Sequence, residues 1–463
     1  MQATLRTHHL FRPSPCWIAR HNGFEINSTS NRVQACLASD YSNRKATPMR
    51  ERKMLVILGT GWGSYSVFKT INKKLYDVMV VSPRNHFLFT PLLASTTVGT
   101  LEFRSVIEPV RNAGFRESDH FHLSHATGLD AKKQELFCTS VINPDLKYSI
   151  PYDKLVIGVG ALTNTFGVPG VAENAFFLKE IADARRIRTR ILSNFELALQ
   201  PNIDPAEASR LLHVVIVGGG PTGVEFGAEL YDFIEQDVAR LYKKQQSQVK
   251  VTLVESNKIL SSFDTRLQSY AEKKLTERKG FEMIQSSVVD VTATTVRLKN
   301  DMVIPCGLVV WSTGLAPRDF TASLDFPKNK MGQILTDHYL RVKDEPSGNI
   351  FALGDCGDIE DMSLPCTAQV AEREGRFLSE FFISGCNEKK CPPFSFKSMG
   401  MLAYIGRYEA LTDTPQMKIK GVPSWFLWRS AYLTRLGSWR LRMQVPLDWL
   451  KTLLFGRDIS RLE

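Results

Sequence analysis

The sequence lacks several features that would assign it to a familiar class. Its eight cysteines form neither a C-x-x-C pair nor a zinc-ligand spacing, and none lies between Cys36 and Cys138. We therefore expect reduced thiols, with neither a bound metal ion nor a redox-active disulfide. No uninterrupted apolar segment reaches the roughly 18 residues that one helix needs to cross a bilayer. No D-x-D/N-x-D/N-G pattern occurs, so an EF-hand and bound calcium are not expected.

Acidic residues are scarce at the two ends of the chain. Residues 1–53 hold nine Lys or Arg and three acids, and residues 424–463 hold seven and three, so the middle of this +10 chain is close to neutral. Nucleic acid is not an expected partner, because its binding usually needs a concentrated basic face. The N-terminal segment 1–53, which contains Arg and Ser and few acids, is typical of an organellar transit peptide, and the mitochondrion is the favoured organelle. The alternative is a disordered tail that carries no targeting signal.

A glycine-rich turn follows the β-branched segment Val214–Val217. Residues 218–223 have the spacing G-x-G-x-x-G and lead into a helical segment that we expect to continue through Tyr242. In such a turn the glycines bend the chain, let a pyrophosphate approach and let the helix pack on the strand. The next strand, 249–254, ends in Glu255, which can bind a ribose diol and would repel a 2′-phosphate. The sequence therefore predicts an NADH site rather than an NADPH site.

A second turn of this kind follows the predicted strand Met54–Leu58. Residues 59–64 read Gly-Thr-Gly-Trp-Gly-Ser, so a small serine replaces the third glycine. The next strand, 77–81, ends in Ser82-Pro83-Arg84-Asn85, without the usual acid for a ribose contact. Two such turns in one chain predict a flavin nucleotide at the first and a nicotinamide nucleotide at the second.

Further strands and turns complete the predicted topology. Strands at 155–159, 308–311 and 349–353 are followed by Gly160, Gly314 and Asp355, respectively. The last strand would return the chain to the first domain, where Asp355 could accept a hydrogen bond from a ribityl hydroxyl or serve only as a turn residue. Residues 176–198 are predicted as a helix and 201–208 as a polar connector.

The C-terminal part is rich in aromatic and leucine residues interleaved with arginine. The segments 425–442 and 447–455 predict one or two amphipathic helices, long enough to lie on a membrane surface but not to cross it. The alternative is a helix whose apolar face packs on protein, either the core or a second copy.

The predicted fold class is therefore α/β, with two Rossmann-like dinucleotide-binding domains, for FAD and NADH, and a C-terminal amphipathic membrane-anchoring region. The predicted divisions are a transit peptide at 1–53, an FAD-binding domain at 54–170 and 331–395, an NADH-binding domain at 171–330, and a membrane-associating region at 396–463.

Taken together, these segments resemble type II NADH dehydrogenases, the single-polypeptide, rotenone-insensitive NADH:quinone oxidoreductases. The resemblance extends from about Met54 to Arg457. It is carried by the motifs at 58–63, 81–93, 218–230, 352–356, 368–371 and 448–458.

The resemblance implies roles that spacing alone does not. Ser82 belongs to the family's own form of the ribose-contact segment, and Thr90 and Pro91 would lie against the isoalloxazine. Gln369 would line the quinone entrance, where Arg373 replaces a frequent second glutamine. Glu225, one turn into the second helix, would face the cofactor junction and hold the nicotinamide amide or relay a proton; it could equally be a helix-dipole acid.

The predicted FAD contacts are Gly59, Gly61, Gly63, Ser82, Thr90, Pro91, Gly160 and Asp355; the NADH contacts are Gly218, Gly220, Gly223, Glu255 and Gly314; the quinone contacts are Gln369 and Arg373; and Glu225 is the predicted catalytic residue. The implied activity is electron transfer from NADH through FAD to ubiquinone, without proton pumping, by a homodimer on the mitochondrial inner membrane. The alternatives are a signalling flavoprotein of the apoptosis-inducing-factor type and a sulfide:quinone oxidoreductase, for which Cys356 is suitably placed. A disulfide reductase is strongly disfavoured, because the redox cysteine pair that it needs after the first nucleotide helix is missing.

Overall fold

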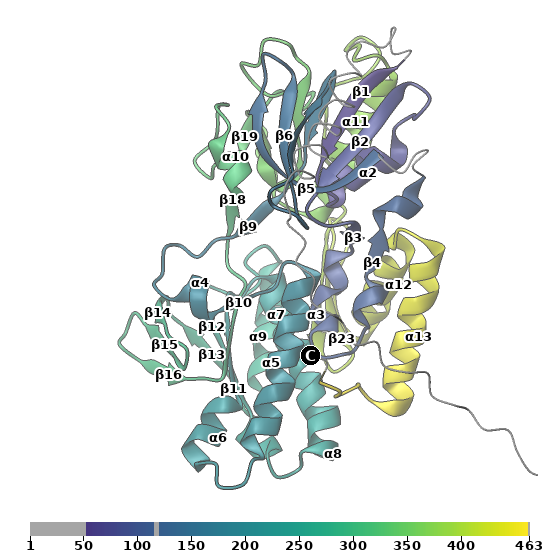
Figure 1. Cartoon of the computed structure of the whole chain (residues 1–463). Coiled ribbons are helices and arrows are strands. Elements are labelled where there is room, and N and C mark those ends of the chain that lie inside the picture. The colour runs from purple at the N-terminus through teal and green to yellow at the C-terminus, as the bar shows by residue number, and fades with distance from the viewer. Residues whose placement is uncertain (1–51, 115–119, 462–463) are drawn as a thin grey trace, which may run out of the picture. The chain divides into compact units, whose positions relative to one another are not determined.

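The computed structural model describes residues 52–114 and 120–461 (Figure 1). The predicted transit peptide lies almost entirely outside them. Among these residues, every helix is too short or too polar to cross a membrane.

The first sheet has seven strands in the order β20-β8-β1-β2-β5-β6-β7. Parallel pairing joins β20, β8, β1, β2 and the start of β5. The side chains of the first four are almost all buried, as expected for strands covered on both faces. The strands are β1 (Lys53–Leu58), β2 (Tyr76–Ser82), β5 (Phe121–Asp130), β6 (Glu135–Ser140), β7 (Lys147–Pro151), β8 (Lys154–Ile157) and β20 (Ile350–Ala352). Helices α2 (Trp62–Thr70) and α11 (Ala368–Ile383) pack together on this sheet.

The second sheet is fully parallel, in the order β10-β17-β11-β12-β13. Its strands are β10 (Phe176–Phe177), β17 (Leu308–Trp311), β11 (His213–Val217), β12 (Lys250–Glu255) and β13 (Phe281–Gln285). The elements that accompany it are α4 (Val171–Asn174), α5 (Ile181–Ala198), α6 (Pro205–Leu211), α7 (Pro221–Phe233), α9 (Thr265–Thr276) and the antiparallel strands β14 (Val288–Val291), β15 (Thr295–Leu298) and β16 (Val303–Pro305). The two sheets confirm the predicted α/β class.

Two short antiparallel strands carry the chain between the sheets. β9 (Ala161–Thr163) leaves the first sheet and pairs with β18 (Leu315–Pro317), by which the chain returns (Figure 1). After α10 (Asp319–Ser323), β19 (Ile334–Thr336) pairs with β21 (Gly357–Ile359) beside β20. The outward and return crossings are therefore side by side.

Helix α7 continues through a π-helical turn (Ile234–Val238) into α8 (Ala239–Leu241), and Tyr242 caps it. This confirms the long helix that was predicted to separate Gly223 from Glu255.

Two local predictions were wrong. The segment 176–198 begins with β10 and becomes helical only at Ile181, because Phe176 and Phe177 pair with β17 and the Asp183 carboxylate accepts the backbone N–H groups of Lys179 and Glu180. The predicted connector at 201–208 contains the first half of α6. Pro205 is its first residue, where a missing N–H costs nothing.

The C-terminal region begins with an antiparallel sheet that the sequence did not indicate. Its strands are β22 (Met401–Gly406), β23 (Glu409–Asp413) and β24 (Lys418–Gly421), and β22 packs on α7. Two helices follow, α12 (Val422–Arg435) and α13 (Trp439–Phe455), in agreement with the amphipathic helices predicted there (Figure 1).

Candidate functional site

A cavity of about 1110 Å³ opens at the carboxyl ends of β1, β2 and β8. This edge of a parallel sheet is the usual place for a ligand. The predicted residues that line it are Gly59, Gly61, Gly63, Ser82, Thr90, Gly160, Glu225, Gly314 and Asp355. Those that do not line it are Pro91, Gly218, Gly220, Gly223, Glu255, Gln369 and Arg373.

Two of the glycines after β1, Gly59 and Gly63, leave no space for larger residues. Gly59 has φ +90°, and a Cβ there would lie 2.4 Å from the Gly158 carbonyl oxygen. A Cβ on Gly63 would lie 2.1 Å from Leu353. Ser64, the substitute third glycine, donates its hydroxyl to the Leu58 carbonyl at 2.7 Å. The first turn of α2 is thus pinned against the sheet, with its N-terminus at the cavity.

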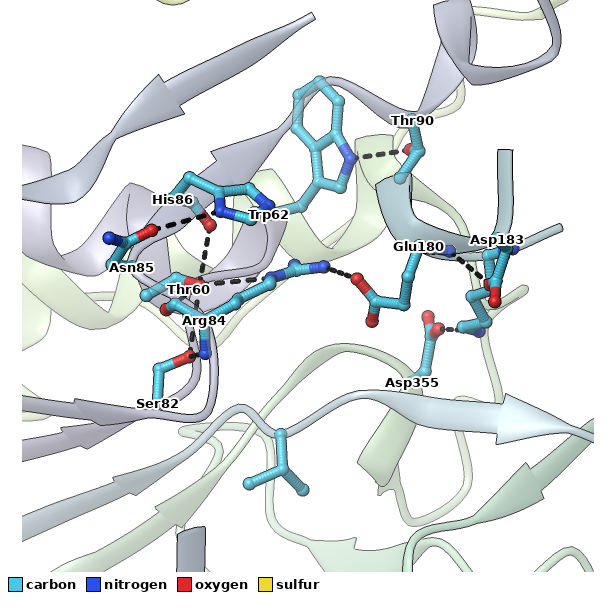
Figure 2. A network of polar contacts seen from close by, with 12 residues as sticks. Thr60, Trp62, Ser82, Arg84, Asn85, His86, Thr90, Glu180, Asp183 and Asp355 are labelled. Carbon is cyan, nitrogen blue, oxygen red and sulfur yellow. Dashed lines mark hydrogen bonds and ion pairs between the residues drawn. The ribbon is translucent and has the colours of Figure 1, made fainter. Parts of the chain in front are cut away.

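The end of β2 is organised around Thr60 and Arg84. Ser82 is buried and contacts the Thr60 hydroxyl at 3.2 Å. Arg84 donates its Nε–H to the same hydroxyl, which lies 2.9 Å from the His86 carbonyl oxygen. Figure 2 shows the Arg84 guanidinium directed from this cluster toward Glu180. The segment that lacks the usual acid therefore presents a cation to the cavity.

The start of α5 brings two charged side chains to the opposite wall. Glu180 pairs with Arg84, and the Lys179 ammonium lies 3.2 Å from Asp355 Oδ2. Asp183 fixes both through hydrogen bonds to their backbone N–H groups, at 3.1 Å for Lys179 and 2.8 Å for Glu180 (Figure 2). Asp355, predicted from its position after a strand, is thus one half of an ion pair.

Aromatic side chains form another wall. The indole N–H of Trp62 donates to the Thr90 hydroxyl at 2.9 Å, so Thr90 is fixed at the cavity edge, and Pro91 follows it without lining the cavity. The Trp62 ring packs against Phe87 and Phe89, and Phe89 in turn contacts Tyr432 of α12. An aromatic layer therefore joins the cavity to the C-terminal helices.

The second glycine turn has the same design as the first. Gly218 has φ +111°, and a Cβ on Gly223 would lie 2.0 Å from the Gly218 carbonyl oxygen. A Cβ on Gly220 would meet nothing within 4 Å, which leaves open space above the turn. Glu255 holds the turn, since its carboxylate accepts the Gly219 N–H at 2.6 Å. Its other oxygen accepts the Asn257 N–H at 2.9 Å.

Glu225 reaches the cavity from α7, so the helix that follows the second glycine turn contributes to the cavity at the first turn. Its carboxylate accepts the Tyr404 N–H of β22 at 3.1 Å. Burial raises the pKa of Glu225 to about 8, although this hydrogen bond acts in the opposite direction. The side chain is therefore largely protonated at neutral pH.

Gln369 and Arg373 lie on α11 behind the cavity. The Gln369 side-chain oxygen accepts the Met399 N–H at 2.9 Å, which ties α11 to the segment before β22. The Arg373 guanidinium lies 5.9 Å from the centre of the Phe396 ring. Both therefore face the C-terminal region.

The cavity fits FAD by its own geometry. At Gly61 a Cβ would meet only Arg84 Nη2, at 3.7 Å, so the turn leaves open space there, and the first N–H groups of a helix such as α2 have no partner within the helix. Arg84 adds positive charge near this N-terminus, and the volume is ample for a dinucleotide. A diphosphate at the N-terminus of α2 is compatible with these groups.

The comparisons with known proteins identify the family of the chain. The family model described as pyridine nucleotide-disulphide oxidoreductase matches residues 53–375, and the NDH2 C-terminal domain matches residues 399–458. An internal alternative NAD(P)H-ubiquinone oxidoreductase from Arabidopsis thaliana is 44% identical, with 94% of this chain and 91% of that protein covered. The chain belongs to the type II NADH dehydrogenase family.

Other relatives support the same membership. A probable NADH dehydrogenase of Dictyostelium discoideum is 45% identical, with 89% of this chain and 91% of that protein covered. The solved structure of NDH2 from Plasmodium falciparum in complex with NADH superposes with a TM-score of 0.84 at 29% identity, covering 89% of this chain and 100% of that one. The type II assignment made from the motifs is thus confirmed.

Four charged residues of the cavity were missed from the sequence: Lys179, Glu180, Arg318 and Asp319. The first two were assigned to the interior of a helix, whereas they stand at its start. The signal was Asp183, because an acid three residues after a helix N-cap is a capping pattern. Arg318 carried no comparable signal.

Proposed function

We propose that the protein is a single-subunit, non-proton-pumping NADH:ubiquinone oxidoreductase that passes two electrons from NADH through FAD to ubiquinone. The observation that carries this is Glu225, a residue of the second glycine turn's helix that lines the cavity built on the first turn. Two dinucleotides bound at these turns would meet at that cavity. FAD supplies the chemistry, accepting a hydride from NADH and delivering electrons to the quinone.

The chain's own residues bind and orient. In the proposal, Gly59, Gly61 and Gly63 admit the FAD diphosphate, Ser82 and Asp355 bind its sugar portions, and Gly160 lines its path. Gly218, Gly220, Gly223 and Gly314 admit NADH. For Glu255 to receive a ribose diol, one of its oxygens must remain within reach while it also holds the Gly219 N–H.

The quinone side of the proposal uses the wall nearest the C-terminal helices. Thr90 and Pro91 would border the flavin ring, and Gln369 and Arg373 would border the path from the membrane. The Gln369 amide N–H₂ is the group with a role here, since its oxygen already accepts the Met399 N–H.

Glu225 is proposed to release a proton toward the reacting groups. Since its pKa is about 8, it holds a proton below that pH and loses it above. We expect kcat to fall about tenfold for each pH unit above the apparent pKa. In Glu225→Gln, this alkaline limb should disappear and kcat should be low at every pH. Steady-state pH profiles measure both effects; a changed NADH KM with an intact limb would mean that Glu225 only binds the nicotinamide.

The stability of the fold gives an independent check on Glu225. A glutamate whose pKa is raised on folding favours the folded state when protonated, and this contribution is lost as pH rises from about 4.5 toward 8. As pH rises over this range, the parent should lose unfolding free energy that Glu225→Gln retains, because glutamine does not titrate. Urea unfolding of both proteins at several pH values measures this difference.

A membrane surface is the proposed site of action, at the mitochondrial inner membrane. Helix α13 exposes Leu450, Leu453, Leu454 and Phe455, with Leu453 68% and Phe455 72% exposed. Other residues of α13 pack against α12 through Arg429. Its guanidinium carbon lies 4.1 Å from the centre of the Trp425 ring and 4.2 Å from the centre of the Trp449 ring. An apolar face backed by a packed aromatic layer suits insertion into a lipid headgroup region.

Replacing Leu450, Leu453 and Leu454 together by serine should release the protein from vesicles of anionic phospholipid while bound FAD is retained. The matched control replaces two exposed apolar residues of the second domain, Met302 and Val303, by serine. Vesicle sedimentation measures the bound fraction. Unchanged association of the triple variant would contradict anchoring by this face, and light scattering of the released protein would test the proposed homodimer.

The activity itself is tested with purified protein. We expect a bound-flavin spectrum and rotenone-insensitive NADH oxidation with a short-chain quinone. Bound FAD without quinone-dependent turnover would favour the signalling alternative. The sulfide:quinone alternative has little support, because Cys356 is buried and its pKa is raised to about 11, which disfavours a reactive thiolate.

A further inference from the structure

One carboxylate in the cavity wall joins arginines from two different parts of the fold. Glu180, at the start of α5, pairs with Arg84 at the end of β2, and Arg318 Nη2 lies 3.3 Å from its other oxygen. Arg318 follows β18, by which the chain returns from the second sheet, and donates its Nε–H to the Val159 carbonyl at 2.7 Å. Glu180 therefore spans the cavity between the two nucleotide-binding sheets.

The position of Glu180 is fixed from behind. Asp183 is buried and its carboxylate accepts the Glu180 N–H at 2.8 Å, so the side chain leaves from a defined helix start. The neighbouring Lys179 is occupied with Asp355. Neither arginine thus has to share Glu180 with that lysine.

Arg84 in turn lies over the N-terminus of α2. Its Nη2 would be 3.7 Å from a Cβ placed on Gly61, the glycine that leaves room for a diphosphate. The end of β2 has no acid of its own, and Glu180 brings one to the same place from α5 (Figure 2).

The charges at this wall are unequal. A single carboxylate is shared by two guanidinium groups, and the Lys179–Asp355 pair is neutral. The cluster of Arg84, Glu180 and Arg318 therefore carries one net positive charge, and the further carboxylate of the wall, Asp319, lies beside Arg318 and not beside Arg84 in the sequence. A net positive cluster with Arg84 near a helix N-terminus suits an anionic diphosphate. Glu180 therefore orients both arginines without cancelling their attraction for a phosphate.

We propose that Glu180 is a positioning residue that holds Arg84 and Arg318 against the flavin nucleotide and so determines how slowly FAD leaves the protein. This rests on the proposed function, since it takes FAD as the occupant of the cavity. We call the two ion pairs of Glu180, with Arg84 after β2 and with Arg318 after β18, the clasp at Glu180. They connect these two segments through the start of α5.

The test follows FAD release from purified, FAD-loaded protein after dilution, by the rise in free-flavin fluorescence. Glu180→Gln should release FAD about fivefold to tenfold faster, as expected for loss of a partly exposed shared ion pair. Glu180→Asp should recover part of the loss. In Arg84→Gln, adding Glu180→Gln should accelerate release much less than it does in the parent, because the two residues act as a pair.

The control is Glu207→Gln, which removes an ion pair with Arg210 on α6, remote from the cavity, and should leave FAD release unchanged. Slower release from Glu180→Gln would overturn the proposal, because Glu180 would then merely compete with the phosphates for the arginines. Equal release from Glu180→Gln and the parent would overturn it as well. Absence of FAD from the parent protein would instead contradict the proposed function.

Discussion

Replacing Arg457 by methionine is expected to lower the free energy of unfolding by about 3–5 kcal/mol, because it leaves buried carboxylates without their counter-charge. Arg457 Nη1 lies 2.9 Å from Asp237 Oδ2, and the two side chains are only 4% and 2% exposed. Its Nη2 lies 3.8 Å from Glu229, which is also buried.

The same side chain connects three parts of the chain. Its Nε–H donates to the Thr100 hydroxyl at 2.8 Å, and that hydroxyl donates to Glu229 at 2.6 Å. Asp237 lies in the π-helical turn after α7, so Arg457 binds the extension of the helix that carries Glu225. The residues just after α13 therefore hold the extension of α7, the helix after the second glycine turn, against the segment that follows α3 (Leu93–Thr96).

Urea unfolding measures the effect of Arg457→Met. Lys273→Met is the control, since Lys273 pairs with Glu277 at 3.8 Å but is 74% exposed, and its loss should cost less than about 1 kcal/mol. Asp237→Asn combined with Arg457→Met should cost less than the sum of the two single changes. Equal destabilisation by Arg457→Met and Lys273→Met would show that the buried network contributes nothing beyond a surface pair.

Replacing Gly220 by alanine is expected to raise the KM for NADH by about tenfold to 100-fold while FAD remains bound. The protein itself has room for this methyl group, since nothing lies within 4 Å and Gly220 has φ −69°, which alanine adopts readily. The space belongs to the diphosphate, and forcing an extra methyl into a close contact costs about 1–3 kcal/mol.

Gly61→Ala is the matched variant in the other turn. Gly61 has the equivalent place before α2, and its nearest neighbour would be Arg84 at 3.7 Å, so the fold tolerates the methyl group. We expect this variant to lose FAD rather than NADH affinity. Flavin content and NADH KM, measured for both variants, should show opposite patterns; the same pattern in both would contradict the assignment of one nucleotide to each turn.

The two glycine turns could be predicted from the sequence because their chemistry is local. A Cβ on Gly223 would collide with the Gly218 carbonyl oxygen five residues earlier. The spacing of the glycines in the sequence therefore follows directly from the close contacts within the turn. Ser64 replaces a glycine at the first turn because its hydroxyl binds the end of β1. The strands that lead into both turns are almost fully buried and read as short apolar runs, β-branched in the case of Val214–Val217.

The clasp at Glu180 could not be read from the sequence, since its partners lie 96 and 138 positions away. The start of α5 was obscured because Phe176 and Phe177 continue the apolar pattern of the helix, although they form a strand. The three-stranded sheet at 401–421 was missed for a similar reason. Its burial depends on α7, which packs against β22, and the local pattern does not reveal that partner.

The crossing at β9 and β18 also determines the order in which the chain can fold during synthesis. All strands of the second sheet lie between residues 176 and 311, so they leave the ribosome before β20 and α11. Until those elements emerge, β8 has one unpaired edge and α2 lacks the helix that covers it. Once residue 330 has left the ribosome, the second sheet therefore has all its strands, whereas the first sheet still lacks β20. The edge of β8 stays open to pairing with another chain until β20 emerges, about twenty residues later, and α2 stays uncovered until α11 is complete, about fifty residues later.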